Sequence, residues 1–306
     1  MRDKFAHTLY KIARQNPKVF IAVADISPAG SMTAFRQEFP DHFINVGIAE
    51  QTMIGLCSGL ALRGCTVFAY TIATFSIYRP FEQIRDDLCY QKVPVTVVGI
   101  GGGLSYSMLG GTHHAQEDIA VMTALPNMSV IAPCDPLETE AATWACTQQR
   151  GPVYLRLGKA GEPNLTENAP DAFEFGKIRM LKKGSGIAIL SYGPITKMAM
   201  DLSALIESKE KGAVALFSVH TLKPLDYKGI SNVLKGFDRV VVIEEHAPYN
   251  GLCSWIKQIA WEIGAKCRLY AFSLKDEFIH VYGSQTNLWD AHGLNLEKIY
   301  RSISTE

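Results

Sequence analysis

Short, almost uninterrupted apolar runs alternate with longer amphipathic stretches along the first half of the chain. The run Val95-Thr96-Val97-Val98 is typical of a strand that is buried on both faces of a parallel sheet. Strands are expected at 19–24, 43–46, 66–71, 94–100, 128–133 and 153–157, and helices at 49–62, 81–90, 116–124 and 137–148. Strands separated by helix-length connections predict a doubly wound α/β domain with right-handed crossovers.

The second half repeats this alternation after a break. Residues 158–176 are rich in Gly, Pro, Asn, Asp and Glu and lack periodicity, which indicates a linker. We therefore expect a first domain at 1–160, a linker at 161–183 and a second doubly wound α/β domain at 184–306. In the second domain, strands are expected at 187–190, 213–219, 240–244 and 268–272, and the clearest helix at 251–264, whose apolar residues recur at helical spacing.

Composition narrows the class of protein. The chain has 306 residues, 47% of them hydrophobic, which is enough for two cores. Thirty basic and thirty acidic residues cancel, and no basic stripe suggests nucleic acid. No run of about 18 apolar residues suggests a membrane span, and the start does not resemble a signal peptide. Seven cysteines without a C-x-x-C pair predict reduced thiols, a cytoplasmic protein and no metal site of its own.

Glu50 is the first candidate for chemistry. It follows the short strand at 43–46 and Gly47, and it begins the apolar helix at 49–62. Parallel sheets bind ligands at the carboxyl ends of their strands, where this acid is expected. The alternative is a structural role, because an acid in the first turn of a helix is favoured by the helix dipole.

Three aromatic residues recur every third position after the strand at 66–71. Phe75, Tyr78 and Phe81 could form a wall for a flat heterocycle. The same spacing also fits side chains that simply pack against the sheet, and on spacing alone that interpretation is favoured.

Two further features follow strands. A loop with six glycines from residue 99 to residue 111 leads to His113 and His114, and its glycine spacing does not fit a dinucleotide-binding fingerprint. Such a loop at a strand end indicates a site, although a histidine is often structural. Arg156 lies in the strand at 153–157 and could bind an anionic substrate through a bidentate contact. An interdomain salt bridge is the alternative for Arg156.

Several motifs, in order, resemble one enzyme family. The segments "DHFINVGIAEQ", "ATFSIYRPFEQIR", "GGTHH", "LPNMSVIAPCDPLE" and "VYLRLG" are similar to the pyrimidine-binding domain of transketolases and of the related deoxyxylulose-phosphate synthases. The segments "AILSYG", "VALFSVHTLKPLD", "VVVIEEH" and "YGSQTNLWDAHGL" resemble the C-terminal domain of the same enzymes. The resemblance implies a pyrimidine-binding domain of the thiamine-diphosphate type followed by a transketolase C-terminal domain.

The diphosphate-binding domain of that family is missing. Its Gly-Asp-Gly motif, with an Asn about 25 to 30 residues later, does not occur in this sequence. The resemblance therefore implies the C-terminal subunit of a split transketolase, which transfers a two-carbon ketol unit between sugars. A separate N-terminal chain would hold Mg²⁺ and the diphosphate of a shared thiamine diphosphate. Self-association through both domains would give an α₂β₂ assembly.

The resemblance also implies roles for residues around the cofactor. Glu50 matches the glutamate that hydrogen-bonds N1′ of the cofactor pyrimidine, and Phe75 and Tyr78 match the aromatic residues that stack on that ring. Phe81 is a weaker match to the same group. Asp25, in "VADIS", matches an acid near the cofactor.

On the substrate side, His113 matches a histidine that contacts the substrate oxygen, and His114 follows it. Arg156 matches the arginine that binds the sugar phosphate, and Arg2 is expected to match a second one. Two positions depart from the family pattern. Leu109 replaces an acid that hydrogen-bonds a hydroxyl of the donor, and Gly101 replaces a histidine that helps to bind phosphate. The donor is therefore expected to differ from an ordinary pentose phosphate.

Two other functions fit part of the pattern. The beta subunit of a thiamine-dependent 2-oxoacid dehydrogenase shares the two-domain layout and the glutamate, and "PFEQIRDDL" and "LKPLD" occur in similar form there. A non-catalytic assembly subunit would keep the fold and lose the site. The presence of Glu50, Phe75 and His113 argues against the second alternative.

Overall fold

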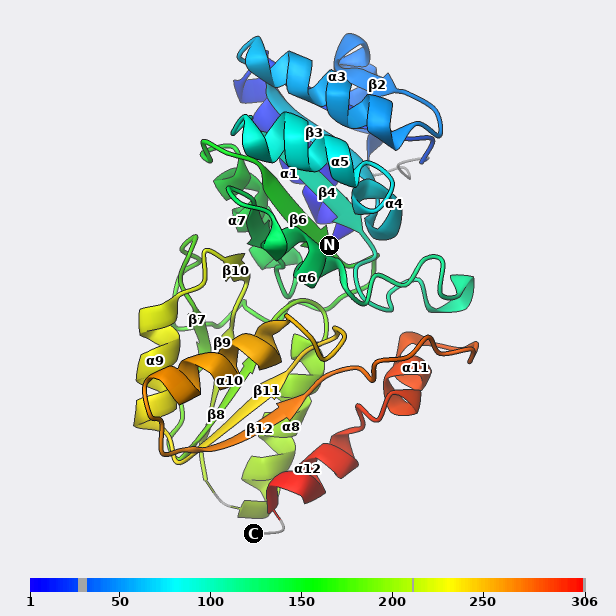
Figure 1. Cartoon of the computed structure of the whole chain (residues 1–306). Coiled ribbons are helices and arrows are strands. Elements are labelled where there is room, and N and C mark those ends of the chain that lie inside the picture. Colours follow the sequence, from blue (N-terminus) through cyan, green and yellow to red (C-terminus); the bar gives the residue numbers. More distant parts are fainter. Residues whose placement is uncertain (27–31, 211, 305–306) are drawn as a thin grey trace.

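The chain folds into two α/β lobes, one stacked on the other (Figure 1). The computed structural model describes residues 1–26, 32–210 and 212–304. The first lobe is built on a seven-stranded sheet with the order β10-β5-β6-β4-β3-β1-β2. Its strands are β1 (Val19–Val23), β2 (Phe43–Asn45), β3 (Thr66–Ile72), β4 (Val95–Ile100), β5 (Ser129–Ile131), β6 (Val153–Leu157) and β10 (Thr221–Lys223). Strands β1 to β6 run parallel.

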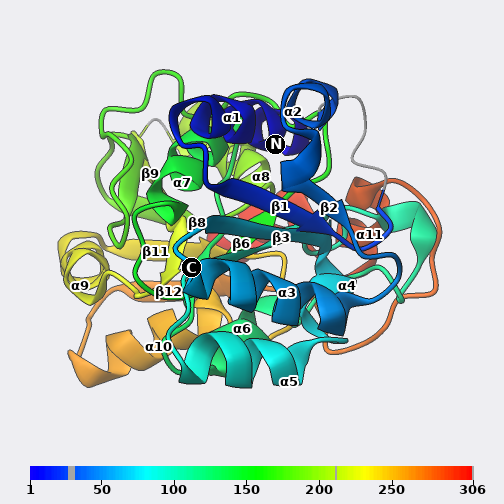
Figure 2. The same ribbon diagram turned by 90° about the horizontal axis from the view of Figure 1, so that it is seen from above.

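Helices cover both faces of this sheet, as the view from above shows (Figure 2). On one face lie α1 (Arg2–Gln15), α2 (Thr33–Glu38) and α7 (Pro136–Cys146), which bury Phe5, Phe35 and Ala142 in one apolar cluster. On the other face lie α3 (Glu50–Leu62), α4 (Ala73–Ile77), α5 (Phe81–Gln83) and α6 (Asp118–Ala124). Burial on both faces explains why the central strands are almost entirely apolar.

The second lobe is also doubly wound, around a sheet with the order β12-β11-β8-β9-β7. Its strands are β7 (Arg179–Lys182), β8 (Ile187–Ser191), β9 (Val214–Ser218), β11 (Arg239–Ile243) and β12 (Arg268–Phe272). Helices α9 (Tyr227–Gly236) and α10 (Leu252–Glu262) contribute to one apolar cluster. Helices α8 (Thr196–Glu210), α11 (Gln285–Ala291) and α12 (Leu296–Ser304) contribute to another. The predicted class, two doubly wound α/β domains, is confirmed.

Most of the predicted elements lie close to their expected ranges, and three departures matter for the architecture. The predicted helix at 81–90 is instead the short α5 followed by a π-helical run, Ile84–Tyr90. Strand β7 lies inside the range expected to be a linker, and it pairs antiparallel with β9 at the edge of the second sheet. Strand β10 comes from the second half of the chain but pairs antiparallel with β5 of the first sheet.

A buried charge joins β6 to the second lobe. The carboxylate Oδ2 of Asp118, the first residue of α6, accepts hydrogen bonds from Tyr154 Oη and Arg156 Nε, both at 2.8 Å. Arg156 Nη2 donates to the backbone carbonyl of Glu245, at 3.2 Å. Only 2% of the Arg156 side chain is exposed. Burial opposes the charge of Arg156, but Asp118, Tyr192 and Glu245 together raise its pKa above the ordinary value.

The described residues contain no membrane-spanning helix, no metal cluster and no disulfide. No helix there is both long and apolar enough to cross a membrane. The same residues contain no group of three or more His, Cys, Asp or Glu placed to hold a metal ion. All seven cysteines carry free thiols.

Asp118→Ala should destabilise the protein strongly, because it would leave Arg156 as a buried charge without its carboxylate. We expect the free energy of unfolding to fall by about 3–5 kcal/mol, measured by urea denaturation. Asp201→Ala is the control, since Asp201 pairs with Lys197 at 2.6 Å on the surface of α8 and such pairs contribute about 0–1 kcal/mol. Equal losses in the two variants would show that the Asp118 pair does not hold the junction.

Candidate functional site

Glu50 is the first residue of α3, at the carboxyl edge of the first sheet. The turn before it is fixed by Asn45, whose side-chain Oδ1 accepts from the backbone N–H of Asp25 at 3.1 Å and of Gly47 at 3.0 Å. Gly47 has a φ of 73°, a conformation that glycine adopts without strain. Only 4% of the Glu50 side chain is exposed. Its carboxylate is therefore held at the positive end of the helix dipole.

Arg79 connects Glu50 to the first of the predicted aromatic residues. Its Nη1 donates to Glu50 Oε1 at 2.8 Å. The carbon atom of the same guanidinium lies 4.2 Å from the centroid of the Phe75 ring, within the range of a cation–π contact. One planar cation thus contacts both the buried carboxylate and the aromatic ring.

His113 lies at the edge of this group. Its ring packs against Phe75 in a T-shaped arrangement with 5.1 Å between centroids, and against Tyr106 at 6.2 Å. Its Nδ1 lies 3.0 Å from the hydroxyl of Thr112. Partial burial, and then the charge of Arg79, lower the pKa of His113. The structure therefore brings Glu50, Phe75 and His113 together near Arg79.

The glycine-rich loop has a steric reason for its composition. Gly101 has a φ of 76°, and a Cβ placed there would lie 2.1 Å from the Tyr106 ring. The ring of Tyr106 thus occupies the space that a side chain at position 101 would need, and it buries this side of the loop. A histidine at position 101 would therefore require the Tyr106 ring to move.

Tyr78 and Phe81 lie against the core. Both are partly buried and pack on the apolar cluster beneath α3 and α6. Burial, and then the carboxylates of Asp118 and Glu117, raise the pKa of Tyr78. Tyr78 therefore lies toward the buried charges at the junction of the lobes. The stacking role of these two residues stays a prediction.

The remaining predicted residues are spread around the same edge. Asp25 follows β1 with a φ of 44° and an exposed side chain, while Ser27 of the same motif lies outside the described residues. His114 is buried, with its Nε2 3.4 Å from the carbonyl of Ser107, and burial lowers its pKa. Arg156 forms its salt bridge with Asp118 of the same lobe and contacts the second lobe through the backbone carbonyl of Glu245; its role in binding a sugar phosphate stays a prediction.

Two cations flank Tyr106 near His113. The Nζ of Lys159 lies 5.3 Å from the centroid of the Tyr106 ring, and Lys159 is exposed. The charge of Arg2 lowers the pKa of Tyr106, against the larger effect of burial. The sequence predicts Arg2 as a site residue but does not single out Lys159. The signal for Lys159 is its position, three residues after Arg156 and just beyond the end of β6.

Arg79 and Tyr106 are two further residues that sequence reasoning misses. Arg79 follows Tyr78 directly inside the aromatic motif, and Tyr106 lies within the glycine-rich loop. Both therefore lie in segments that the sequence marks as candidate sites. Which ring or carboxylate they contact depends on side-chain conformation, which the spacing of residues does not show.

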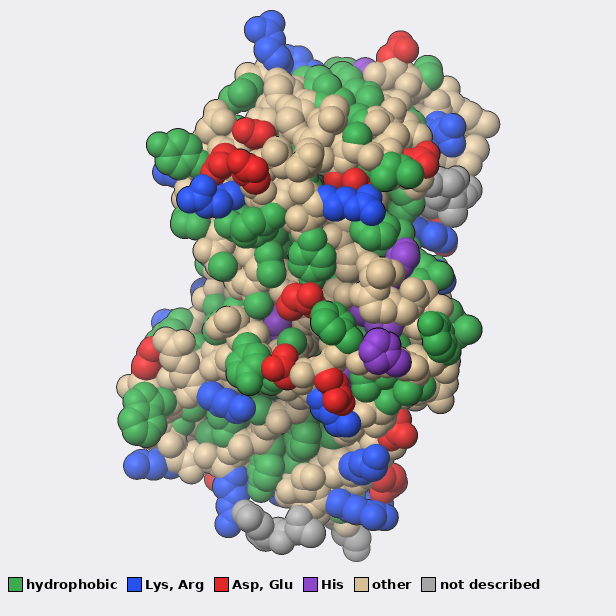
Figure 3. All heavy atoms as spheres, turned by 45° about the vertical axis from the view of Figure 1, so that its right-hand side comes forward, with side chains coloured by type: hydrophobic (Ala, Val, Ile, Leu, Met, Phe, Trp, Pro, Cys, Tyr) green, Lys and Arg blue, Asp and Glu red, His purple; other side chains and the backbone are tan. Residues whose placement is uncertain are grey.

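Exposed apolar side chains adjoin this edge. Leu109 is 51% exposed and Phe278 is 65% exposed. A Cβ on Gly111 would lie 3.7 Å from Phe278, so the loop and the segment before α11 are neighbours. Figure 3 shows histidine side chains gathered at the waist between the lobes, with hydrophobic side chains beside them.

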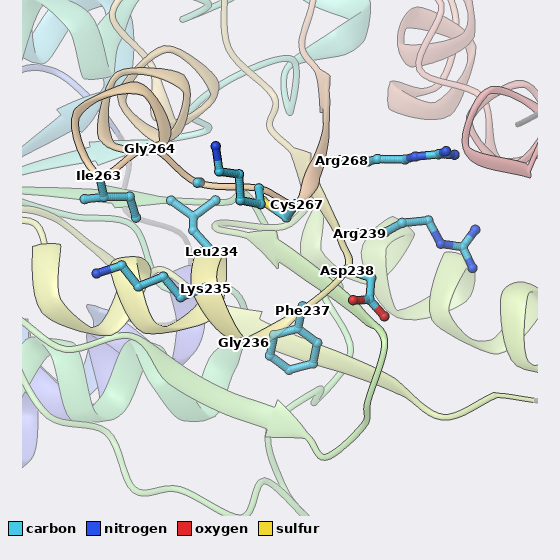
Figure 4. Close-up of a pocket in the computed structure, with 12 residues that line it drawn as sticks. Leu234, Lys235, Gly236, Phe237, Asp238, Arg239, Ile263, Gly264, Cys267 and Arg268 are labelled. Carbon is cyan, nitrogen blue, oxygen red and sulfur yellow. The ribbon is translucent and has the colours of Figure 1, made fainter.

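A separate hollow of about 710 Å³ lies at the far end of the second lobe. Residues 234–239 and 263–268 line it, after α9 and α10 (Figure 4). These segments precede β11 and β12, so the hollow opens at the amino ends of the strands. Open α/β sheets bind ligands at the opposite end, and we place no site there.

Comparison with known proteins identifies the family. Residues 1–162 match the transketolase pyrimidine binding domain, and residues 176–299 match the transketolase C-terminal domain. The chain belongs to the transketolase family.

Two proteins that this chain resembles are named as subunits of transketolases. The chain is 31% identical to a subunit of the apulose-4-phosphate transketolase of Phocaeicola vulgatus, over 98% of this chain and 95% of that protein. It is 29% identical to a 6-deoxy-6-sulfo-D-fructose transketolase subunit of Clostridium sp., over 99% and 92%. A solved structure titled "Split gene transketolase, inactive beta4 tetramer" is 30% identical, with a TM-score of 0.88 over 99% and 97% of the two chains.

The position of Arg79 in this transketolase chain can be tested through His113. In the wild-type chain, the ring proton of His113 should titrate below its ordinary pKa of 6.5. Arg79→Gln should raise that pKa, because the nearby positive charge is removed. Nuclear magnetic resonance of the full chain measures both values. His292, whose pKa is lowered to about 4 mainly by burial, should keep the same pKa in the two proteins. An unchanged His113 pKa would show that the charge of Arg79 does not lie close to the His113 ring.

Proposed function

We propose that this chain is the C-terminal subunit of a two-chain, thiamine-diphosphate-dependent transketolase. The enzyme would transfer a two-carbon ketol unit from an anionic ketose to an aldose or another aldehyde. One observation carries the proposal: a buried carboxylate and an aromatic ring contact one planar group at the carboxyl edge of a parallel sheet, and a histidine packs against that ring. Relatives named as transketolase subunits, similar along nearly the whole chain, support it.

The residues present fit the aminopyrimidine of the cofactor. The face of Phe75 and the carboxylate of Glu50 already contact a flat, nitrogen-bearing group that donates an N–H. When bound, thiamine diphosphate supplies a carbanion that attacks the ketose carbonyl. Phe75 would support the face of the pyrimidine, and Glu50 would hold the proton at N1′.

His113 would act on the substrate. It lies beside Phe75, and the lowering of its pKa favours the neutral form of the ring. A neutral imidazole can donate one hydrogen bond and accept another. It could therefore position a substrate oxygen and exchange a proton with it. The hydroxyl of Thr112, 3.0 Å from Nδ1, is placed to orient the ring.

A partner chain would complete the site. Mg²⁺ is bound through oxygen ligands together with the phosphates of its substrate or cofactor, and we propose that the partner supplies those ligands. The exposed apolar group near Leu109 and Phe278 adjoins the site and would be covered in an α₂β₂ assembly. The solved split-gene transketolase, described as an inactive β₄ tetramer, supports a requirement for another chain.

The anionic end of the donor would lie near Tyr106. The Nζ of Lys159 lies near this ring, the charge of Arg2 lowers the pKa of Tyr106, and His113 packs beside the same ring. Arg156 has its Nε on Asp118, and only 2% of its side chain is exposed. We therefore favour Arg2 and Lys159 over Arg156 as the contacts for a phosphate or sulfonate.

The donor itself would be a modified ketose. Leu109 is exposed beside the site and cannot read a donor hydroxyl, and Gly101 offers no side chain for phosphate. A site that hydrogen-bonds a hydroxyl rejects analogues lacking it, because its own polar group is then left unpaired. A site without that polar group no longer rejects them. The two relatives named for apulose 4-phosphate and for 6-deoxy-6-sulfo-D-fructose support a branched, deoxy or sulfonated sugar.

Glu50→Gln should abolish most activity while the complex still forms. The amide keeps the shape but cannot deliver the proton, so kcat should fall on the order of 10²-fold or more. Phe75→Ala should instead weaken cofactor binding by about 1–3 kcal/mol. Activity and calorimetry on the complex, co-purified through a tag on this chain, measure both effects.

The isolated chain provides the control for this experiment. It should show no activity and no tight binding of thiamine diphosphate, since the partner would hold the diphosphate. Tight binding by the chain alone, or cofactor C2 proton exchange at the wild-type rate in Glu50→Gln, would contradict the proposal.

A panel of ketose donors tests the substrate. We expect a branched, deoxy or sulfonated ketose to be used at least as well as xylulose 5-phosphate. Leu109→Asp should shift kcat/KM toward xylulose 5-phosphate by about tenfold, or roughly 1.4 kcal/mol. Met108→Asp, which adds the same charge at the neighbouring exposed position, is the matched control. A preference of the wild type for xylulose 5-phosphate by orders of magnitude would refute this choice of donor.

A further inference from the structure

Arg79 makes the two contacts that the proposed function assigns to the cofactor ring. Its guanidinium lies 4.2 Å from the centre of the Phe75 ring and 2.8 Å from Glu50 Oε1, measured from its carbon and from Nη1. A guanidinium is planar, delocalised and rich in N–H donors, so it stacks on aromatic faces and pairs with carboxylates. An aminopyrimidine that hydrogen-bonds to Glu50 and packs on Phe75 needs the same two partners.

We propose that the Arg79 side chain occupies the aminopyrimidine subsite of this chain and must leave it before the cofactor binds. The inference rests on the proposed function, which places the ring between Phe75 and Glu50. Arg79 and the ring compete, because one face of Phe75 cannot stack on both and one carboxylate oxygen cannot hold both at the same position. Arg79 is thus an internal substitute for the ligand.

Electrostatics explain why a substitute is useful. Only 4% of the Glu50 side chain is exposed, and a buried carboxylate without a partner is costly. Arg79 supplies a charge-assisted hydrogen bond in the chain without cofactor. The bound pyrimidine, sharing a proton with Glu50, would take over that role.

The position of Arg79 allows it to leave. It lies between the short helices α4 and α5, and 45% of its side chain is exposed. Its charge can therefore return to water without crossing the core. While Arg79 occupies the subsite, the cofactor ring cannot bind there. The apparent affinity for the cofactor is therefore reduced in proportion to the fraction of chains in which the subsite is open. The diphosphate, held by the partner, would provide the binding energy that displaces Arg79.

The test measures thiamine diphosphate binding to the assembled complex, by calorimetry for affinity and by stopped flow for association. Arg79→Gln should bind the cofactor about tenfold more tightly, or roughly 1.4 kcal/mol, and associate faster, because no flat cation has to leave. Arg79→Lys keeps the charge but loses the flat stacking group, and it should lie between the two. Arg85→Gln is the matched control, since Arg85 is exposed and pairs with Asp86 rather than Glu50; it should behave as wild type.

The outcomes separate this inference from the proposed function. A wild-type complex that binds no thiamine diphosphate would defeat the proposed function and the inference with it. A wild-type complex that binds the cofactor, together with an Arg79→Gln complex that binds it equally or less well, would overturn the inference alone. Equal cofactor affinity of wild type and Arg79→Lys would show that the positive charge alone weakens cofactor binding. That result would overturn the proposal that the flat guanidinium occupies the subsite. Urea denaturation confirms that each variant is folded, so equal binding cannot be attributed to unfolding.

Discussion

The buried pair of Asp118 and Arg156 holds the candidate site in place. It ties the start of α6 to β6, and Arg156 reaches the second lobe through the carbonyl of Glu245. The Glu245 side chain in turn accepts a hydrogen bond from Leu104 N–H at 3.0 Å. The loop that carries His113 is therefore anchored at both of its ends to this junction. Without these contacts the histidine would have no fixed position relative to Glu50.

The parts of the fold that can be predicted from the sequence are those with local signals. Strands β4 and β6 are buried on both faces and mostly apolar, and the helix α3 follows a glycine turn, so their predicted ranges are close to the observed ones. Helix α1 is not predicted, although Phe5, Leu9 and Ile12 have helical spacing. Strand β10 cannot be found this way, because it is very short and its partner β5 lies about 90 residues earlier.

The candidate site is predictable where residue type and motif order carry the information. The sequence points to Glu50, Phe75 and His113, and the structure places them around one planar cation. Arg79 is missed because its contact with Glu50 spans 29 residues and depends on one side-chain conformation. Arg156 shows the opposite case. The sequence marks its position, but only packing distinguishes a charge buried against Asp118 from one that faces a substrate. The catalytic and binding roles of all these residues remain proposals.

Strand β10 has a consequence for how the two lobes can be separated. It belongs to the second half of the chain, yet it covers the edge strand β5 of the first sheet. A fragment cut between the domains would leave backbone N–H and C=O groups of β5 unpaired, and open edges of this kind promote aggregation. The two lobes are therefore not interchangeable modules. Grafting the first lobe onto a foreign C-terminal domain would also require a strand that seals this edge.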